Sequence, residues 1–494
     1  MAKDWKNLGG LRSRLGQISI APETDPAEIS ALRTQIAEVE RQLGKSRAES
    51  KPGEKSTDPL VPQIAAALPK RSCLVEFFQL RETPNGEDSV GAIVLSLDGH
   101  AKRVDFGNKA AIEAQVRAFR ESIAAGDEES LRRVSNELSQ ELVAPLLEAM
   151  PGGTERLFVS PDGELNFLPF AVLPVCPDGP FLGETRTIAM LASGKDLLNA
   201  ARPAYAKTVA IFANPAFEQS SGKSVAPAFA LKPDEHEGFR QIALPALPGA
   251  DAEAVHIEAA ARLNGWQPMR FLQADANEGR LRQIVSPGIL HLATHGFYLN
   301  SRAASPGQRG MQPVPIAPRR EENKNGVNPM WASGVALAGA QKTFESWADG
   351  RSTDFPNDGV LTAEEVAALN LDGTWLVTLS ACETGMGEAR SGEGVLGLRR
   401  AFMMAGAQNL LMTLWPVNDE ATAHFMEDFY KRSLANGEAV GALAESQRKW
   451  LGKLRSEKGL LAAVRDAGPF VMATTGRPKA VLFLSKPKKG RFLR

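Results

Sequence analysis

Short apolar runs alternate with helical segments through the second half of the chain. The runs are "TVAIFAN" (208–214), "GILHLATHG" (288–296), "TWLVTLSAC" (374–382) and "NLLMTLW" (409–415). Patterns typical of amphipathic helices stand between them, at 251–263, 277–285, 362–371 and 394–406. Strands that are apolar on both faces are typical of parallel sheets covered by helices on each side. The sequence therefore predicts an α/β fold with a mostly parallel sheet and helices on both faces.

The chain divides into three segments. Residues 1–70 combine an amphipathic helical pattern at 27–44 with a polar linker rich in Gly, Pro, Ser and Lys. Residues 71–203 contain strand-like runs such as "CLVEFFQL" and one helical stretch, 109–149, so they predict a smaller α/β unit. Residues 204–494 hold the alternating pattern and form the main α/β domain, in which "AVLFL" near the end is the expected last strand.

The composition excludes several classes of protein. With 494 residues, 43% hydrophobic and 23% charged, the chain is neither fibrous nor disordered and is long enough for two or three domains. A net charge of −1 gives no general attraction to nucleic acid or to an anionic membrane. The first thirty residues lack the apolar core of a signal peptide, and no run of about 18 apolar residues occurs, so we expect a cytoplasmic protein.

The three cysteines are too few and too scattered for a disulfide framework or a zinc site, which is consistent with reduced thiols. They are Cys73, Cys176 and Cys382. His291 and His295 are spaced as in a helical metal motif, but on a strand four residues span roughly 13 Å, too far for one ion. His291 is therefore interpreted as a residue of the core or one that supports a site residue, and no metal or cofactor is predicted.

Two of the apolar runs end in side chains that can take part in catalysis. One leads to His295 and Gly296, and the other ends at Cys382. If the two strands are parallel neighbours, their carboxyl ends lie at one edge of the sheet and bring the imidazole and the thiol together. An imidazole can accept the proton of an attacking thiol, and the amides of Gly296 and Cys382 could donate to an oxyanion. The alternative is a buried structural cysteine and a hydrogen-bonded histidine.

Four stretches together resemble the CHAT domain, a caspase-like module often found beside TPR repeats. They are "HLATHG", "LSACETGMGE", "GEGVLGLRRAFMMAGAQNLLMTLWPVNDEAT" and "VSPDGELNFLPFAVLP". The resemblance covers roughly residues 70–480 and places the chain with the caspase, gingipain and separase group of cysteine peptidases. It implies a caspase-like fold in which His295 and Cys382 form a catalytic dyad. By the same comparison, the 71–203 unit could be a degenerate second copy of this fold.

The stretch "LWPVND" is similar to a separase stretch in which an acidic residue receives a basic side chain of the substrate. This resemblance implies that Asp419 binds Arg or Lys of a substrate; the alternative is that Asp419 caps the following helix. The chain shows no TPR repeats, so its sensing part is either absent or supplied by a partner.

The leading hypothesis is a latent cysteine endopeptidase that cleaves cytosolic proteins and is activated by a partner protein or complex. The segment 301–327 is rich in Pro, Gly and Arg and is either a lid, a site of self-processing or a solvated loop. The alternatives to a peptidase are a caspase-fold interaction module without turnover and a cysteine hydrolase of small molecules.

Overall fold

The computed structural model describes most of the chain between residues 60 and 476. The described residues are 11, 31, 32, 34–36, 38, 39, 60–80, 87–199, 204, 206–219, 242–298, 330, 333–349, 357–380, 389, 390, 394, 395, 397–417 and 419–476. Three predicted features lie outside this part of the chain: the linker at 44–59, the segment 301–327 and the strand "AVLFL".

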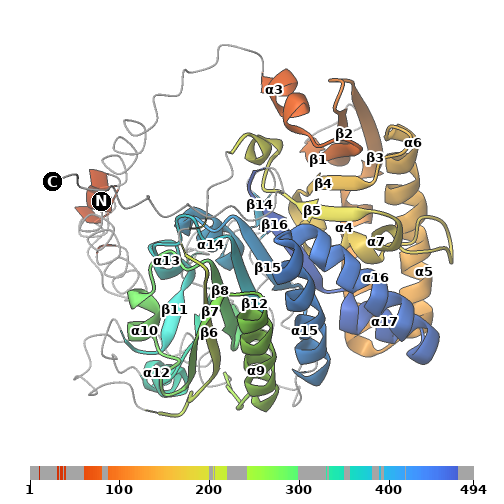
Figure 1. Cartoon of the computed structure of the whole chain (residues 1–494). Helices are drawn as coiled ribbons and strands as arrows, with labels where there is room; N and C mark the ends of the chain where they lie inside the picture. Colours follow the sequence, from red (N-terminus) through yellow and green to blue (C-terminus); the bar gives the residue numbers. More distant parts are fainter. Residues whose placement is uncertain are drawn as a thin grey trace.

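One sheet of eleven strands organises the structure (Figure 1). In spatial order its strands are β3 (Ala101–Asn108), β2 (Ser89–Ser96), β1 (Ser72–Leu80), β4 (Arg156–Ser160), β5 (Thr187–Met190), β16 (Phe470–Thr474), β15 (Asn409–Thr413), β12 (Leu376–Ser380), β8 (Ile289–Ala293), β6 (Thr208–Pro215) and β7 (Gln267–Gln273). The pairs β2–β3, β1–β2 and β15–β16 are antiparallel, and the other neighbours in this sheet are parallel. The predicted mostly parallel α/β fold is confirmed.

Two smaller sheets and the helices complete the described fold. The smaller sheets are β11 (Val360–Thr362), β10 (Ser333–Ala336) and β9 (Gly296–Tyr298), and the hairpin of β13 (Ala389–Arg390) and β14 (Gly394–Val395). The first half contains α3 (Leu60–Ala67), α4 (Lys109–Ala125), α5 (Glu128–Leu138), the π-helix η1 (Ser139–Val143), α6 (Ala144–Ala149), the 3-10 helices η2 (Gly163–Phe167), η3 (Phe170–Val172) and η4 (Gly194–Leu198), and α7 (Leu182–Thr185). The second half contains α9 (Pro248–Leu263), α10 (Glu278–Gln283), α12 (Ala340–Ala348), α13 (Ala363–Val366), α14 (Leu398–Ala405), α15 (Asp419–Asn436), α16 (Ala439–Lys458) and α17 (Leu460–Ala467).

Helices cover both faces of the central strands, as the apolar pattern predicts. In β8, Ile289 and Ala293 belong to the buried cluster that includes α9 and α15, while Leu290 and Leu292 belong to the cluster that includes α13 and α14. The side chains of a strand alternate between the two faces of its sheet, and both faces here are buried. Figure 1 shows α9 and α15 side by side on one face.

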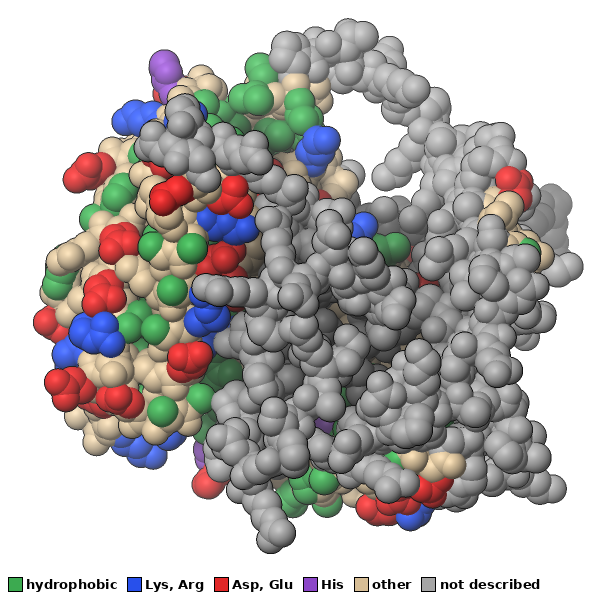
Figure 2. All heavy atoms as spheres, turned by 180° about the vertical axis from the view of Figure 1, so that it is seen from behind, with side chains coloured by type: hydrophobic (Ala, Val, Ile, Leu, Met, Phe, Trp, Pro, Cys, Tyr) green, Lys and Arg blue, Asp and Glu red, His purple; other side chains and the backbone are tan. Residues whose placement is uncertain are grey.

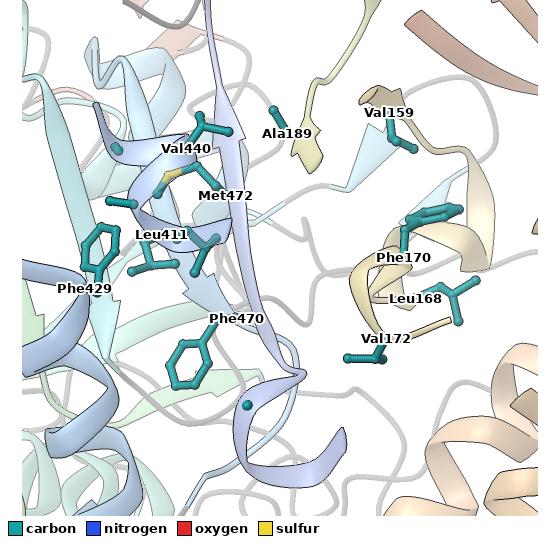
Figure 3. Packing of buried hydrophobic residues seen from close by; sticks show 14 of the residues in the cluster. Val159, Leu168, Phe170, Val172, Ala189, Leu411, Phe429, Val440, Phe470 and Met472 are labelled. Carbon is teal, nitrogen blue, oxygen red and sulfur yellow. The ribbon is translucent and has the colours of Figure 1, made fainter. Parts of the chain in front are cut away.

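The two halves of the sheet meet where β5 lies beside β16. The pair is parallel, with Met190 opposite Ala473, so β1–β5 and the strands from β6 onward form one continuous sheet. The apolar core also continues across this junction, because Phe170 from the first half and Phe470 from the second belong to one buried cluster (Figure 3). The division into units 71–203 and 204–494 falls in the connection from β5 to β6 and stays a prediction.

Local signals explain why the stretch 109–149 forms several helices instead of one. Asn108 caps the start of α4 by accepting a hydrogen bond from the Ala111 amide, and Gly126 ends it with φ 71°. A left-handed residue is a common helix terminator, and glycine adopts this conformation without steric cost. Asp127 then accepts from the Ser130 amide and starts α5.

Two further predictions differ from the structure at the level of single elements. The helix expected at 362–371 is much shorter: α13 ends at Val366, and a capping box of Thr362 and Glu365 forms its start. The strand β16 was not predicted.

In the pattern at 27–44, the described residues of 31–39 are helical, and Leu32 and Ile36 are buried with the spacing of one helix face.

The surface carries charges of both signs. On the described part of the face in Figure 2, acidic and basic side chains are interspersed, as the near-zero net charge leads one to expect. Among the described helices, none combines the length and the hydropathy needed to span a lipid bilayer.

Candidate functional site

β8 and β12 are adjacent and parallel, which is the arrangement that the predicted Cys/His pair requires. The register places Ala293, the last residue of β8, opposite Ser380, the last residue of β12. Both strands therefore end at the same edge of the sheet. His295 follows Ala293 by two positions, and Cys382 follows Ser380 by two positions. Cys382 lies outside the described residues.

The imidazole of His295 is oriented by a backbone carbonyl. Its Nε2 lies 2.8 Å from the carbonyl oxygen of Pro245, and because a carbonyl oxygen only accepts, Nε2 carries the proton. The neutral ring then has its lone pair on Nδ1. The ring also packs against Phe217, with ring centroids 5.1 Å apart. This arrangement makes Nδ1 the atom of His295 that can accept a proton.

The backbone next to His295 is fixed by β10. The amide of Ala336 donates to the carbonyl oxygen of His295 at 2.8 Å, and Gly296 lies opposite Val335. In an antiparallel ladder, hydrogen-bonded pairs alternate with pairs that are not hydrogen-bonded. Because the pair of His295 and Ala336 carries the bond, the amide of Gly296 is directed away from β10.

A third strand end contacts the chain just after Pro245. Asn214, near the end of β6, accepts a hydrogen bond from the Leu247 amide at 2.8 Å and donates to Asp251 at 2.9 Å. Its φ of 44° lies in the left-handed region, which asparagine tolerates better than most residues. Sequence reasoning did not select Asn214 or Pro245. The signal for Asn214 is an asparagine followed by a proline at the end of an apolar run.

Asp419 is the first residue of α15. Its side chain is outside the described structure. The pocket role and the capping role of this residue both stay predictions.

A buried polar network lies under the ends of β8 and β12. His291 has no exposed surface, which confirms its interpretation as a core residue. Its Nδ1 lies 3.0 Å from the Tyr430 hydroxyl, and its Nε2 lies 3.1 Å from Oε1 of Glu253. The second contact is within ion-pair distance but lacks the angle of a directed hydrogen bond. The Tyr430 hydroxyl lies 2.8 Å from Oγ1 of Thr378, and Ser380 donates to Oε2 of Glu253 at 2.9 Å.

Glu253 and Tyr430 were not predicted. Glu253 is 3% exposed and shares the buried face of α9 with Ala250, Ala254 and Ile257. A glutamate at the position of an apolar residue in a helical stripe is the signal that could have indicated it. Burial raises the pKa of Tyr430, and the Glu253 carboxylate raises it further, so the tyrosine is a neutral hydroxyl at any physiological pH.

The first half of the molecule contacts the segment that follows Cys382. The described part of that segment includes the hairpin β13–β14, which lies against η2. Beside it, the buried guanidinium of Arg399 donates to the side chain of Asn166 and to the carbonyl oxygen of Leu191, each at 3.1 Å. Burial lowers the pKa of Arg399 to about 10, partly offset by Asp196. Arg399 therefore connects the start of α14 to the first half while keeping its charge.

The described part of the chain contains no group of three or more His, Cys, Asp or Glu side chains placed to hold a metal ion. Glu278 is buried, and its pKa is raised by that burial and by Asp358 and Glu365. Arg282 lies within ion-pair distance of Glu278 and Glu365. We interpret these groups as a structural ion-pair cluster.

The CHAT domain family model matches residues 132–471 of this chain. Tetratricopeptide repeat protein 28 of Mus musculus is 26% identical over 327 residues, and that of Homo sapiens is 27% identical over 318 residues. Each match covers 62% of this chain, and this chain spans 12% of the length of these relatives.

Two solved structures that are similar to this chain cover most of its length. The Saccharomyces cerevisiae separase–securin complex matches with a TM-score of 0.49 and 7% identity, covering 84% of this chain and 30% of that chain. The Arg-specific cysteine proteinase gingipain R matches with a TM-score of 0.36 and 8% identity, covering 76% of this chain and 75% of that chain.

Proposed function

This chain belongs to the CHAT domain family, and from that premise we propose that it is a caspase-like cysteine endopeptidase whose catalytic pair is His295 and Cys382. The observation that carries the proposal is the register of β8 and β12. Each candidate residue follows, by one strand period of two residues, the pair of Ala293 and Ser380 that ends the two strands. Loops at the carboxyl ends of parallel strands are the usual place for function in such sheets.

The contacts of His295 support a defined role in acyl transfer. The Cys382 thiol attacks the scissile carbonyl, a carbon–sulfur bond forms, and the thiol proton moves to Nδ1 of His295. The proton on Nε2 stays hydrogen-bonded to the Pro245 carbonyl oxygen, which holds the ring and favours its protonated form. The amides of Gly296 and Cys382 donate to the oxyanion.

Collapse of this intermediate breaks the carbon–nitrogen bond. His295 gives the proton to the leaving amine, and the acyl group stays on Cys382 as a thioester. Water then attacks the thioester, and His295 accepts a proton from that water. Release of the acid product restores the thiol and the neutral ring, so no co-reactant other than water is needed.

The proposed substrates are proteins cleaved after a basic residue. Asp419, at the first turn of α15, would place a carboxylate near the substrate side chain before the scissile bond. We further propose that the enzyme is latent and that a partner protein activates it, because uncontrolled cleavage of proteins would be harmful to a cell.

An active-site label tests the assignment. The full chain is incubated with three peptidyl acyloxymethyl ketones that end in Arg, Asp or Leu, in an extract of the cells that make it so that the activating partner is present. The modified cysteine is identified by mass spectrometry. We expect the Arg probe to label Cys382 and Cys382→Ala to abolish labelling and substrate cleavage, a loss of at least about a thousandfold. Cys176→Ser is the matched control, because Cys176 is exposed and lies in the first half. Labelling of another residue in Cys382→Ala would refute the nucleophile, and equal labelling by the Leu probe would refute the role of Asp419.

A second candidate function is an interaction module without turnover. It is favoured by one observation: a histidine held by a backbone carbonyl and an aromatic ring is also what a structural histidine looks like. If His295→Ala leaves the reactivity of Cys382 unchanged between pH 5 and 9, the interaction module is the better account of the function than the peptidase.

A further inference from the structure

One buried carboxylate contacts both strands that lead to the proposed catalytic pair. Glu253, on α9, places Oε1 3.1 Å from Nε2 of His291 in β8. Its Oε2 accepts a hydrogen bond from Ser380 in β12 at 2.9 Å. The side chain is 3% exposed, so water hardly competes with these partners for the carboxylate. Glu253 therefore connects β8 to β12 from above one face of the sheet.

A second bridge joins the same two strands from α15. The Tyr430 hydroxyl lies 3.0 Å from Nδ1 of His291 and 2.8 Å from Oγ1 of Thr378. Thr378 is the residue opposite His291 in the sheet. The network thus has two bridges from His291 to β12, one through Glu253 to Ser380 and one through Tyr430 to Thr378.

Stability alone gives a weak reason for such a network. Charged and polar groups lose hydration when they are buried, and well-packed apolar replacements of similar volume are often neutral or stabilising. Buried polar contacts do, however, fix the relative position of the elements that carry them. Three contacts of this network have hydrogen-bond geometry, and the fourth, between Glu253 and His291, is a close polar contact at 3.1 Å. Here the carrying elements are β8, β12, α9 and α15, which lie among the buried apolar residues of one face.

Each of these four elements leads to one part of the proposed site. β8 leads to His295, β12 leads to Cys382, and α15 begins at Asp419. The residues just before α9 include Pro245, whose carbonyl oxygen accepts from His295. A network that fixes the four elements against one another therefore also fixes the parts of the site.

We propose that Glu253 is a positioning residue for the pair of His295 and Cys382. It acts by fixing the ends of β8 and β12 relative to each other along the strand direction. This inference rests on the proposed function. Catalytic groups need to be held within about 0.5 Å of their productive geometry, so a small slip of one strand end is enough to separate an imidazole from a thiol.

The chemistry of the carboxylate explains why glutamate is needed. Both of its oxygens accept, so it can accept from Ser380 and face the Nε2–H of His291 at the same time. In Glu253→Gln one oxygen becomes an NH₂ group, which only donates. Facing His291, that group meets an N–H; facing Ser380, it can donate to the hydroxyl. In both orientations the side chain keeps its volume but loses its charge, so its contacts with Ser380 and His291 are weaker than those of the carboxylate.

The test uses the reactivity of Cys382 toward iodoacetamide in the full chain carrying Cys176→Ser. The second-order rate constant is measured from pH 5 to 9 by mass spectrometry of the Cys382 peptide. A nearby imidazolium raises the thiolate fraction below the ordinary thiol pKa, so at pH 6.5 we expect His295→Ala to lower the rate about tenfold or more. At the same pH we expect Glu253→Gln to lower it about tenfold, and Tyr430→Phe and Ser380→Ala about threefold each.

The double variant Glu253→Gln with His295→Ala separates positioning from general structural damage. If Glu253 acts by aligning the pair, its loss has no further effect once His295 is absent, and the double variant reacts like His295→Ala alone. Glu184→Gln is the matched control: Glu184 is also a largely buried carboxylate in an ion pair, with Arg455 at 2.8 Å, but lies in the first half. It should stay within about twofold of the parent rate.

Each outcome decides between named alternatives. Glu253→Gln reacting like the parent protein, or losses that multiply in the double variant, would overturn the positioning role while leaving the catalytic pair intact. No effect of His295→Ala would instead overturn the proposed function, and the positioning role with it. If Glu253→Gln fails to unfold cooperatively on heating, Ser380→Ala decides in its place, because it removes the arm to β12 and keeps the contact between Glu253 and His291.

Discussion

The two halves of the sheet differ most clearly in the residues just beyond the ends of their parallel strands. In the first half, β4 ends at Ser160, and two positions later the buried Asp162 accepts a hydrogen bond from the Gly163 amide at 2.8 Å. In the second half, β12 ends at Ser380, and two positions later the sequence has Cys382. The first half uses this position to start a turn, whereas the second half provides a thiol there.

The buried cysteine of the first half shows the same contrast between the two halves. Cys73 lies within β1 and has no exposed surface, and burial raises the pKa of its thiol to about 12. The same type of residue is therefore buried and un-ionised inside a strand of one half, and follows the end of a strand in the other, where we propose a nucleophile. Within the described residues, the network around Glu253 and His291 also belongs to the second half. Layered α/β packing is common to both halves, so the halves differ in the residues at their strand ends and in the buried groups beneath them.

The largest expected effect is the difference in thiol reactivity between the two halves. With a pKa raised by about three units, Cys73 should carry roughly a thousandfold less thiolate at pH 8 than an ordinary thiol. We expect iodoacetamide to modify Cys176 and Cys382 in the native protein and Cys73 only after unfolding, as peptide mass spectrometry would show. Rapid native modification of Cys73 would break the comparison.

The same shift makes stability depend on pH in alkaline solution. The unfolded thiol ionises near pH 9 and the buried thiol near pH 12, so the stabilising contribution of the buried neutral form is complete below pH 9 and is lost as the pH rises toward 12. The free energy of unfolding of the natural protein should fall more steeply above pH 9 than that of Cys73→Ala. Parallel denaturant titrations at pH 8, 9.5 and 10.5 would measure the two slopes.

An intermediate effect tests whether the halves share one core. Phe470 is 1% exposed and stacks on Phe425 with ring centroids 3.9 Å apart. We expect Phe470→Ala to lower the free energy of unfolding by about 3–5 kcal/mol, because it removes a large buried side chain. Hydrogen exchange should report the loss in β4 and in β8 alike. A loss confined to the second half would show that the two halves unfold independently, in favour of the predicted division into units.

The smallest effect comes from a matched pair of strand-end serines. The Ser160 hydroxyl donates to the Ala192 carbonyl oxygen at 3.2 Å, and the Ser380 hydroxyl donates to Glu253 at 2.9 Å. Replacing either serine by alanine should cost about 1 kcal/mol of unfolding free energy, the usual contribution of one partly buried hydrogen bond. Only Ser380→Ala should also slow the alkylation of Cys382. Equal effects of both variants on that rate would remove the distinction between the two strand ends.

Much of the fold could be predicted from local patterns. β8 and β12 are continuous apolar runs bounded by glycine, and the right-handed crossover rule makes such strands good candidates for neighbours. β16 was missed because "FVMAT" is a short run directly after a helix, and only pairing with β15 and β5 makes it a strand. The expected last strand, "AVLFL", is as apolar as β16, so local composition does not distinguish the two.

The supporting residues of the site were hidden for a similar reason. His295 and Cys382 stand at the ends of strands, where a sequence pattern can identify them. Glu253 and its partner Ser380 are 127 positions apart, and neither has a neighbour in the sequence that indicates the other. Partnerships of this kind arise from packing between elements, so a single sequence indicates candidate reactive groups more readily than the buried groups that contact their strands.

The position of β16 affects the order in which the sheet can be assembled. This strand occupies the middle of the sheet, between β5 and β15, yet its residues 470–474 come after all the other described strands in the chain. During synthesis, β5 and β15 are therefore both unpaired edges until β16 leaves the ribosome, and unpaired edges favour aggregation. A chain that ends before residue 470 would keep both edges open and should need a chaperone far more than the longer chain does.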